Sequence, residues 1–160
     1  MLNLYIIAGC NGAGKTTASF TILPEMLNCK EFVNADSIAE GLSPFNPESV
    51  AFEAGRIMLQ RIHELMKTKV DFAFETTLAT RSYVSFLKNA RNLGYRITLL
   101  FFGYILLVLY TPICDTWMIV DNRGIIPELV AQGIQNGESM ILNSYTWNTI
   151  LAQSKQNGKQ

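Results

Sequence analysis

A glycine-rich motif near the N-terminus carries residue types and a spacing suited to phosphate binding. The chain meets the pattern G-x-x-x-x-G-K-[ST] at residues 9–16. Glycines in such a loop adopt backbone angles closed to other residues, so consecutive N–H groups can turn inward around a phosphate. Lys15 would add a full positive charge, and Thr16 a hydroxyl ligand for Mg²⁺. We therefore expect a nucleoside triphosphate site formed by Gly9, Cys10, Asn11, Gly12, Ala13, Gly14, Lys15, Thr16 and Thr17.

The stretches on either side place this motif where a phosphate loop belongs. The apolar run 4–8 predicts a short buried strand, and residues 16–23 predict a helix that is interrupted at Pro24. Strand, glycine loop and helix in this order favour a binding mechanism over a chance pattern, because the start of the helix adds its own partial positive charge.

Strand-like and helix-like stretches then alternate, which is typical of a parallel sheet built from β-α-β units. We predict strands at 4–8, 31–33, 71–74, 97–102 and 117–120, and helices at 16–23, from Pro47 to about Leu65, at 82–93 and at 127–132, with a loop at 41–46. These elements indicate an α/β protein with the P-loop NTPase fold, in which helices flank a mainly parallel five-stranded sheet. We expect a single domain over 1–153 and a polar tail at 154–160.

Three acidic residues follow predicted strands, namely Asp36, Glu75 and Asp121. Ligands of open α/β sheets bind beyond the carboxyl ends of the strands, so these carboxylates should share one edge with the phosphate loop. A kinase needs a carboxylate that takes the proton of the acceptor hydroxyl, and Asp36 is our candidate, with helix capping as the alternative. Glu75 would position substrate or hold Mg²⁺ through water, whereas a turn explains Asp121 more simply.

The composition narrows the class of protein. The 160 residues include 13 basic and 13 acidic side chains, so no overall charge excess points to nucleic acid. Three cysteines without C-x-x-C spacing favour reduced thiols and a cytoplasmic location. Residues 97–114 carry no charge and reach the minimum length of a membrane helix, but Gly103 and Pro112 interrupt them. A buried strand suits the start of this stretch better, and we expect no membrane insertion.

Three motifs in order resemble the zeta-toxin-like phosphate-loop kinases. They are the loop at 9–17, the triplet Asn34-Ala35-Asp36, and the run Phe74-Glu75-Thr76-Thr77-Leu78 with Arg81-Ser82-Tyr83 after it. The resemblance implies a kinase that uses ATP and Mg²⁺ to phosphorylate a small molecule, such as the nucleotide sugar UDP-N-acetylglucosamine. It also implies an antitoxin protein as a partner.

The same resemblance distributes roles over the matching positions. Lys15 and Thr16 become the contacts to phosphate and Mg²⁺, and Asp36 becomes the catalytic base. Glu75, with Thr76 and Thr77 beside it, becomes the acceptor-site group. Arg81 heads a predicted helix near Glu75, from which it would reach the substrate.

One segment departs from the family. Between the fourth predicted strand and Pro112, the family carries a helical segment whose arginines close over the ATP phosphates, whereas residues 103–109 contain no basic side chain. Two functions therefore stay open, a small-molecule kinase and an ATP-binding module that lost turnover with its lid. A GTPase switch is disfavoured, because no Asn-Lys-x-Asp motif follows the fourth predicted strand.

Overall fold

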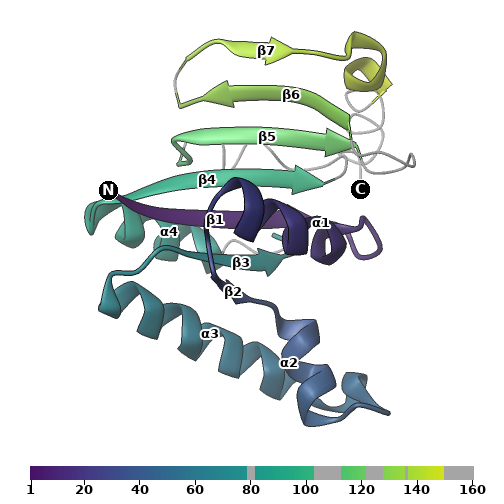
Figure 1. The fold of residues 1–160 in the computed structure, drawn as a ribbon, viewed down its shortest axis with the longest axis vertical. Coiled ribbons are helices and arrows are strands. Elements are labelled where there is room, and N and C mark those ends of the chain that lie inside the picture. Colours follow the sequence, from purple (N-terminus) through teal and green to yellow (C-terminus); the bar gives the residue numbers. More distant parts are fainter. Residues whose placement is uncertain (79–81, 103–112, 122–127, 136, 150–160) are drawn as a thin grey trace.

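The centre of the computed structural model is a sheet of seven strands in the order β2-β3-β1-β4-β5-β6-β7 (Figure 1). The structure describes residues 1–78, 82–102, 113–121, 128–135 and 137–149. From β2 to β5 all neighbouring strands are parallel, whereas β6 and β7 are antiparallel additions at one edge. The strands are β1 (Leu2–Gly9), β2 (Glu31–Val33), β3 (Phe72–Thr76), β4 (Tyr95–Phe102), β5 (Thr116–Asp121), β6 (Glu128–Ile134) and β7 (Ser139–Ile141).

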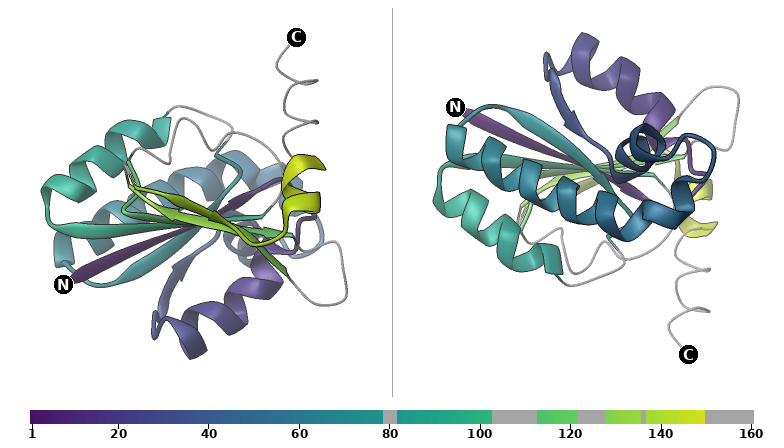
Figure 2. Two further views of the ribbon diagram at one scale, coloured as in Figure 1. Left: turned by 90° about the horizontal axis from the view of Figure 1, so that it is seen from above. Right: turned by 90° about the horizontal axis from the view of Figure 1, so that it is seen from below.

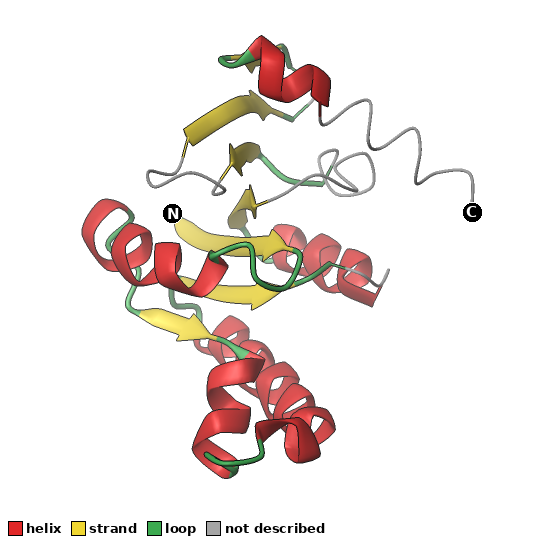
Figure 3. Ribbon diagram, turned by 90° about the vertical axis from the view of Figure 1, so that its right-hand side faces the viewer, coloured by secondary structure: helices red, strands yellow, loops and turns green. Residues whose placement is uncertain are grey.

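Helices cover both faces of this sheet. Helix α1 lies on one face, and α3 and α4 lie on the other (Figure 2). The viewpoint of Figure 3 shows α2 and α3 beside each other below the parallel strands. The helices are α1 (Lys15–Thr21), continued by a π-helical turn (Ile22–Met26), α2 (Ala35–Leu42), a 3-10 turn (Pro47–Val50), α3 (Ala51–Thr68) and α4 (Ser82–Asn92), and a further helical segment covers 144–149.

The central strand β1 explains why the core has two halves. Successive side chains of a strand point to opposite faces, and here both faces are apolar. Leu4, Ile6 and Ala8 pack into the cluster under α3 and α4, and Tyr5 and Ile7 pack into the cluster under α1 and the π-helical turn. This strand is therefore anchored on both sides, which holds the loop that follows it in a fixed place.

Helix α3 packs as its sequence predicts. Ala54, Met58, Ile62 and Leu65 recur at helical spacing and are all buried against the sheet. Ala51, which was expected on the same face, is exposed at the start of the helix. The predicted helix start at Pro47 opens as a 3-10 turn, and the preceding Asn46 makes no side-chain cap.

The prediction of a helix at 127–132 is wrong. The sheet also has seven strands instead of the predicted five. The residues from Glu128 onward form β6, which pairs with β5 and buries Val130 and Ala131. A Cβ on Gly133 would lie 2.4 Å from Cζ2 of Trp117, so only glycine lets the strand pass this ring. Pairing with a neighbouring strand therefore decides the local structure here, against the helical pattern of the sequence.

The uncharged stretch begins as the sequence predicts, because residues 97–102 lie inside β4. Residues 103–112 and the predicted tail at 154–160 lie outside the described residues. Among the helices that the structure describes, none has the length and apolar character needed to cross a membrane.

The first prediction concerns Gly9, the last residue of β1. Its φ is +146°, and a Cβ at this position would lie 1.9 Å from the backbone oxygen of Phe102 on β4. Overpacking costs about 1–3 kcal/mol and a strained backbone about as much again, so Gly9→Ala should lower the free energy of unfolding by at least about 2 kcal/mol. Denaturant unfolding measures this value.

Gly41→Ala in α2 is the matched control. Beyond its own turn of helix, no described atom lies within 4 Å of the position that its Cβ would take, and alanine stabilises a helix by about 0.5–1 kcal/mol relative to glycine. If Gly9→Ala were as stable as Gly41→Ala, the close contact between β1 and β4 would not exist as described.

Candidate active site

The glycine loop joins β1 to α1 at the carboxyl edge of the sheet. Its glycines have the left-handed or otherwise glycine-specific angles that the sequence predicts, with φ of +146° at Gly9, +77° at Gly12 and +73° at Gly14. Gly14 is the residue before α1, and no side chain caps the helix there. The amides of the first turn are therefore not taken up by a side-chain cap, as a phosphate-binding loop requires.

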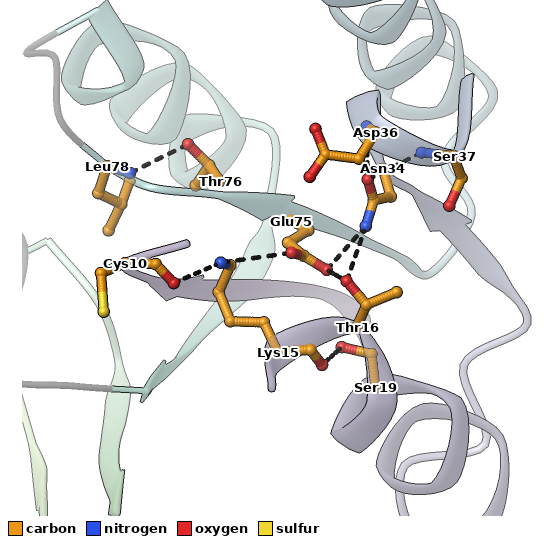
Figure 4. Close-up of polar contacts among 10 residues, drawn as sticks. All are labelled: Cys10, Lys15, Thr16, Ser19, Asn34, Asp36, Ser37, Glu75, Thr76 and Leu78. Atoms are coloured by element: carbon orange, nitrogen blue, oxygen red, sulfur yellow. Dashed lines mark hydrogen bonds and ion pairs between the residues drawn. The ribbon is translucent and has the colours of Figure 1, made fainter. Parts of the chain in front are cut away.

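Lys15 lies buried at the start of α1, and its ammonium group faces the loop. Its Nζ donates a hydrogen bond to the backbone oxygen of Cys10 at 2.9 Å and lies 3.5 Å from Oε1 of Glu75. The Lys15 and Glu75 side chains are only 6% and 7% exposed, so the two opposite charges compensate each other where little solvent reaches them. This arrangement fixes the Lys15 ammonium group beside the backbone of the loop (Figure 4).

Glu75 reaches the loop because of strand pairing. Strand β3 is the parallel neighbour of β1, and Glu75 is in register with Ile7, two residues before Gly9. Its Oε2 accepts a hydrogen bond from Oγ1 of Thr16 at 2.9 Å and another from Nδ2 of Asn34 at 2.8 Å. The carboxylate thus connects the loop, β3 and the residue that follows β2, and its burial is offset by two hydrogen-bond donors and the ion pair with Lys15.

Asp36 lies in the first turn of α2, with its side chain exposed. The alternative that it caps a helix is wrong, because the cap of α2 is Asn34, whose Oδ1 accepts the backbone N–H of Asp36 at 2.7 Å and of Ser37 at 3.3 Å. The Asp36 carboxylate points away from Ser37 in Figure 4. It is therefore not used for capping.

A cavity of about 490 Å³ is lined by Lys15, Asn34, Asp36 and Glu75, whereas Thr16 is hydrogen-bonded to Glu75 but does not line it. The glycine loop and the ends of β2 and β3 form one side of it, and α3 forms the other, with the exposed Phe52 and Arg56 on its wall. The described residues that line the cavity are Asn11, Lys15, Asn34, Ala35, Asp36, Ala51, Phe52, Gly55, Arg56, Met58, Leu59, Glu75, Thr76, Thr77 and Tyr83.

Most other predicted positions can be placed. Thr76 and Thr77 line the cavity, and Oγ1 of Thr76 accepts the N–H of Leu78 at 3.1 Å, which closes the turn after β3. Arg81 lies outside the described residues. Asp121 ends β5 at the same edge of the sheet, but β5 is separated from β1 by β4, and Asp121 does not line this cavity.

The donor set fits Mg²⁺ held jointly with a nucleotide. Among the described residues, no three histidine, cysteine or acidic side chains gather into a metal site of their own. Mg²⁺ usually takes one or two protein oxygens and completes its shell with phosphates and water. Thr16, which donates its proton to the Glu75 carboxylate, supplies such an oxygen next to the phosphate loop.

Two residues without a role predicted from the sequence, Asn34 and Arg56, also line the cavity. Asn34 appeared only as part of a motif, although an asparagine before an acidic first turn is a typical helix start. No role was predicted for Arg56, because the helical spacing of α3 predicts only which residues of that helix face the sheet. Nothing in the sequence pattern shows that Arg56 faces the cavity.

A parallel sheet with a glycine loop between β1 and α1, a buried lysine and a hydroxyl at the helix start defines the P-loop NTPase fold. The family model for zeta toxin matches residues 3–103, and the chain belongs to this family. The family resemblance seen in the motifs is thereby confirmed.

The proteins that are similar to this chain include one curated relative and several solved structures. An uncharacterized protein of Haemophilus influenzae (strain ATCC 51907 / DSM 11121 / KW20 / Rd) is 30% identical over 96 residues, which cover 59% of this chain and 66% of that protein. The PezAT toxin–antitoxin system of Streptococcus pneumoniae matches with a TM-score of 0.57 and 15% identity, over 79% of this chain and 70% of that chain.

The complex of AvrRxo1-ORF1 and AvrRxo1-ORF2 with ATP matches with a TM-score of 0.67 and 13% identity, over 94% of this chain and 63% of that chain. A putative kinase from Chloroflexus aurantiacus J-10-fl has a TM-score of 0.53 and 14% identity, over 64% and 59%. The chain thus spans less than two thirds of the AvrRxo1 chain, the Chloroflexus kinase and the Haemophilus protein. At these identities the likeness to the solved structures shows the fold.

Proposed function

We propose that the chain binds ATP with Mg²⁺ in the cavity between the glycine loop and α3 and transfers the γ-phosphate to a hydroxyl group of a small molecule. The observation that carries this proposal is the convergence of Lys15, Glu75 and Asp36 on that cavity, with Thr16 hydrogen-bonded to Glu75. Membership of the zeta toxin family and the ATP-bound AvrRxo1 neighbour support it.

In this reaction a bond forms between the acceptor oxygen and the γ-phosphorus, and the bond from that phosphorus to the β–γ bridging oxygen breaks, releasing ADP. Asp36 takes the proton of the acceptor hydroxyl. Lys15 and the loop amides hold the β-phosphate in place. Mg²⁺, when bound, neutralises charge on the outer phosphates, and Thr16 with Glu75 would hold it.

The acceptor site would be the α3 side of the cavity. Thr76 and Thr77 offer hydroxyl groups there, Arg56 a positive charge, and Phe52 an aromatic surface. We propose a nucleotide sugar as the acceptor, and UDP-N-acetylglucosamine is the first to test, on the basis of the family resemblance. The same family and the PezAT neighbour support an antitoxin protein as partner. The three free cysteines support a cytoplasmic location.

The second candidate function is ATP binding without turnover. It is favoured by residues 103–109, which hold no basic side chain and begin where the family match ends, at residue 103. Incubation with γ-labelled ATP and either UDP-N-acetylglucosamine or a pool of metabolites separates the two candidates. A labelled product that needs Asp36 supports the kinase, whereas tight binding with no product supports the binding module.

A second prediction tests the nucleotide site. Lys15→Ala should weaken ATP binding about 10–100-fold in calorimetry, because a charge-assisted hydrogen bond contributes about 1.5–3 kcal/mol. Lys30→Ala is the matched control, since Lys30 is exposed and does not line the cavity. An unchanged affinity in a folded Lys15→Ala protein would remove this residue from the site.

Cys10 gives the same experiment an independent readout. Cys10 is exposed in the loop, whereas Cys29 and Cys114 are buried, and burial raises their pKa values to about 11 and about 12. Since thiolates are the reactive form, alkylation near neutral pH should modify Cys10 fast and the other two slowly. ATP should slow the labelling of Cys10 in the natural chain and much less in Lys15→Ala.

A further inference from the structure

The side-chain amide of Asn34 has a fixed orientation. Its Oδ1 accepts the backbone N–H groups of Asp36 and Ser37 in the first turn of α2, and the side chain is buried, with 5% exposure. A backbone N–H can only donate, so the oxygen of the amide must face α2. The nitrogen must therefore face the opposite way, toward Glu75 (Figure 4).

The Asn34 nitrogen meets two groups of the proposed metal site. It donates to Oε2 of Glu75 at 2.8 Å and lies 3.3 Å from Oγ1 of Thr16, which itself donates to the same carboxylate oxygen at 2.9 Å. A hydroxyl group has one proton and two lone pairs. With its proton toward Glu75 and one lone pair toward Asn34, the Thr16 hydroxyl keeps one lone pair for another partner.

Helix capping alone does not explain this residue. A cap needs only an acceptor, and serine, threonine or aspartate would serve equally well in the first turn of α2. An aspartate here would place a second carboxylate about where the amide nitrogen now meets Glu75, and the two would repel each other. A hydroxyl group also accepts and donates, but from a single oxygen. The Asn34 amide carries its acceptor and its donor on two atoms, one facing the first turn of α2 and the other the Glu75 carboxylate.

We infer that Asn34 is a positioning residue that orients the Thr16 hydroxyl and the Glu75 carboxylate for Mg²⁺ and, through the cap of α2, fixes the backbone that carries Asp36. The inference rests on the proposed function and extends it. The buried Asn34 amide would then contact both the proposed Mg²⁺ ligands, Thr16 and Glu75, and the backbone of the proposed base, Asp36. Loss of a hydrogen bond that orients a metal ligand typically weakens metal binding about 10–100-fold.

The test compares the affinity for a non-hydrolysable ATP analogue with and without Mg²⁺, by calorimetry, in the natural chain and in Asn34→Ser and Asn34→Thr. Both variants keep the cap acceptor, but their shorter side chains end at α2 and do not reach Glu75. We expect the gain in affinity from Mg²⁺ to fall about 10–100-fold in both. The affinity without Mg²⁺ is the reference for this gain in each protein, and a cooperative thermal unfolding transition shows that each variant is folded.

Asn46→Ser is the matched control, since Asn46 is exposed and makes no side-chain cap. If either folded Asn34 variant keeps the full gain from Mg²⁺, the residue is a helix cap only and the inference is overturned, while the proposed function stands. A natural chain whose affinity does not respond to Mg²⁺ overturns it as well. If the natural chain binds no nucleotide at all, the proposed function itself fails, which is a different result.

Discussion

Replacement of Asp36 by asparagine is expected to lower phosphoryl transfer by about 10²–10⁴ while leaving ATP binding intact, since general-base groups contribute this much to rate. Asparagine keeps the size of the side chain but has no oxygen basic enough to take a proton. The fold should tolerate the change, because Asn34 and not Asp36 caps α2. The lost interaction of the charge with the start of the helix costs only about 0.3–1 kcal/mol. Turnover of labelled ATP with an acceptor and calorimetric ATP affinity are the two measurements.

Glu53→Gln is the matched control for this variant. Glu53 also lies in the first turn of a helix, α3, and is exposed, but it does not line the cavity. Both proteins should unfold at similar temperatures. If Asp36→Asn keeps more than about a tenth of the natural turnover, the base is another residue, and Glu75 becomes the first candidate.

The parallel half of the fold can be predicted from the sequence because its signals are strong and local. Strand β2 is predicted at its observed bounds, and the predicted core of β1 lies inside the observed strand. The predicted part of β1 is apolar on both faces, and each of the two strands is followed by clear glycine or helix-start residues. The apolar positions of α3 are likewise set by a period that can be read directly from the residues.

The antiparallel edge cannot be predicted in this way. Strand β6 depends on its pairing with β5 and on the fit of Gly133 under Trp117, and neither contact has a local signature. All three residues of β7 are exposed, so no buried face marks them as a strand. Helix α2 has a sequence signal, the Asn34 cap, but at eight residues it is short enough to be taken for a loop.

Most residues of the candidate site can be predicted from the sequence, but the hydrogen bonds between them cannot. The loop glycines, Lys15 and Thr16 follow from a motif, and Glu75 from its place in a strand. That Glu75 accepts from both Thr16 and Asn34 depends on the register of β3 against β1 and on the start of α2. These are contacts between distant segments, so spacing along the chain does not reveal them.

The contact with Thr16 also bears on the role of Glu75. The resemblance implies an acceptor-site group, whereas the hydrogen bond from the Thr16 hydroxyl favours the alternative in which this carboxylate helps to hold Mg²⁺. Both uses remain predictions, and the dependence of ATP affinity on Mg²⁺ in a Glu75→Gln variant separates them.

The largest effect is expected for the unmodified chain in comparison with kinases that carry lid arginines. Its nucleotide binding should be intact, but its phosphoryl transfer should be slow or absent. Binding in the ground state rests on the loop amides, Lys15 and Mg²⁺. Transfer additionally needs positive charge over the moving phosphoryl group, and an arginine in that role contributes about 10³–10⁵ in rate. This is about 4–7 kcal/mol of barrier, and residues 103–109 offer no cation to supply it.

Other arginines of the chain could supply the positive charge that a lid would bring to the phosphates, and replacing each of them tests this alternative. Arg56 lines the cavity from α3, and Arg81 and Arg123 lie outside the described residues. Turnover of the isolated chain should be at least about 10³-fold below the range of about 1–100 s⁻¹ that is usual for kinases. Residual activity that disappears in Arg56→Ala, Arg81→Ala or Arg123→Ala would identify the substitute cation. Turnover within the usual range that none of these variants reduces would show that this site needs no arginine lid.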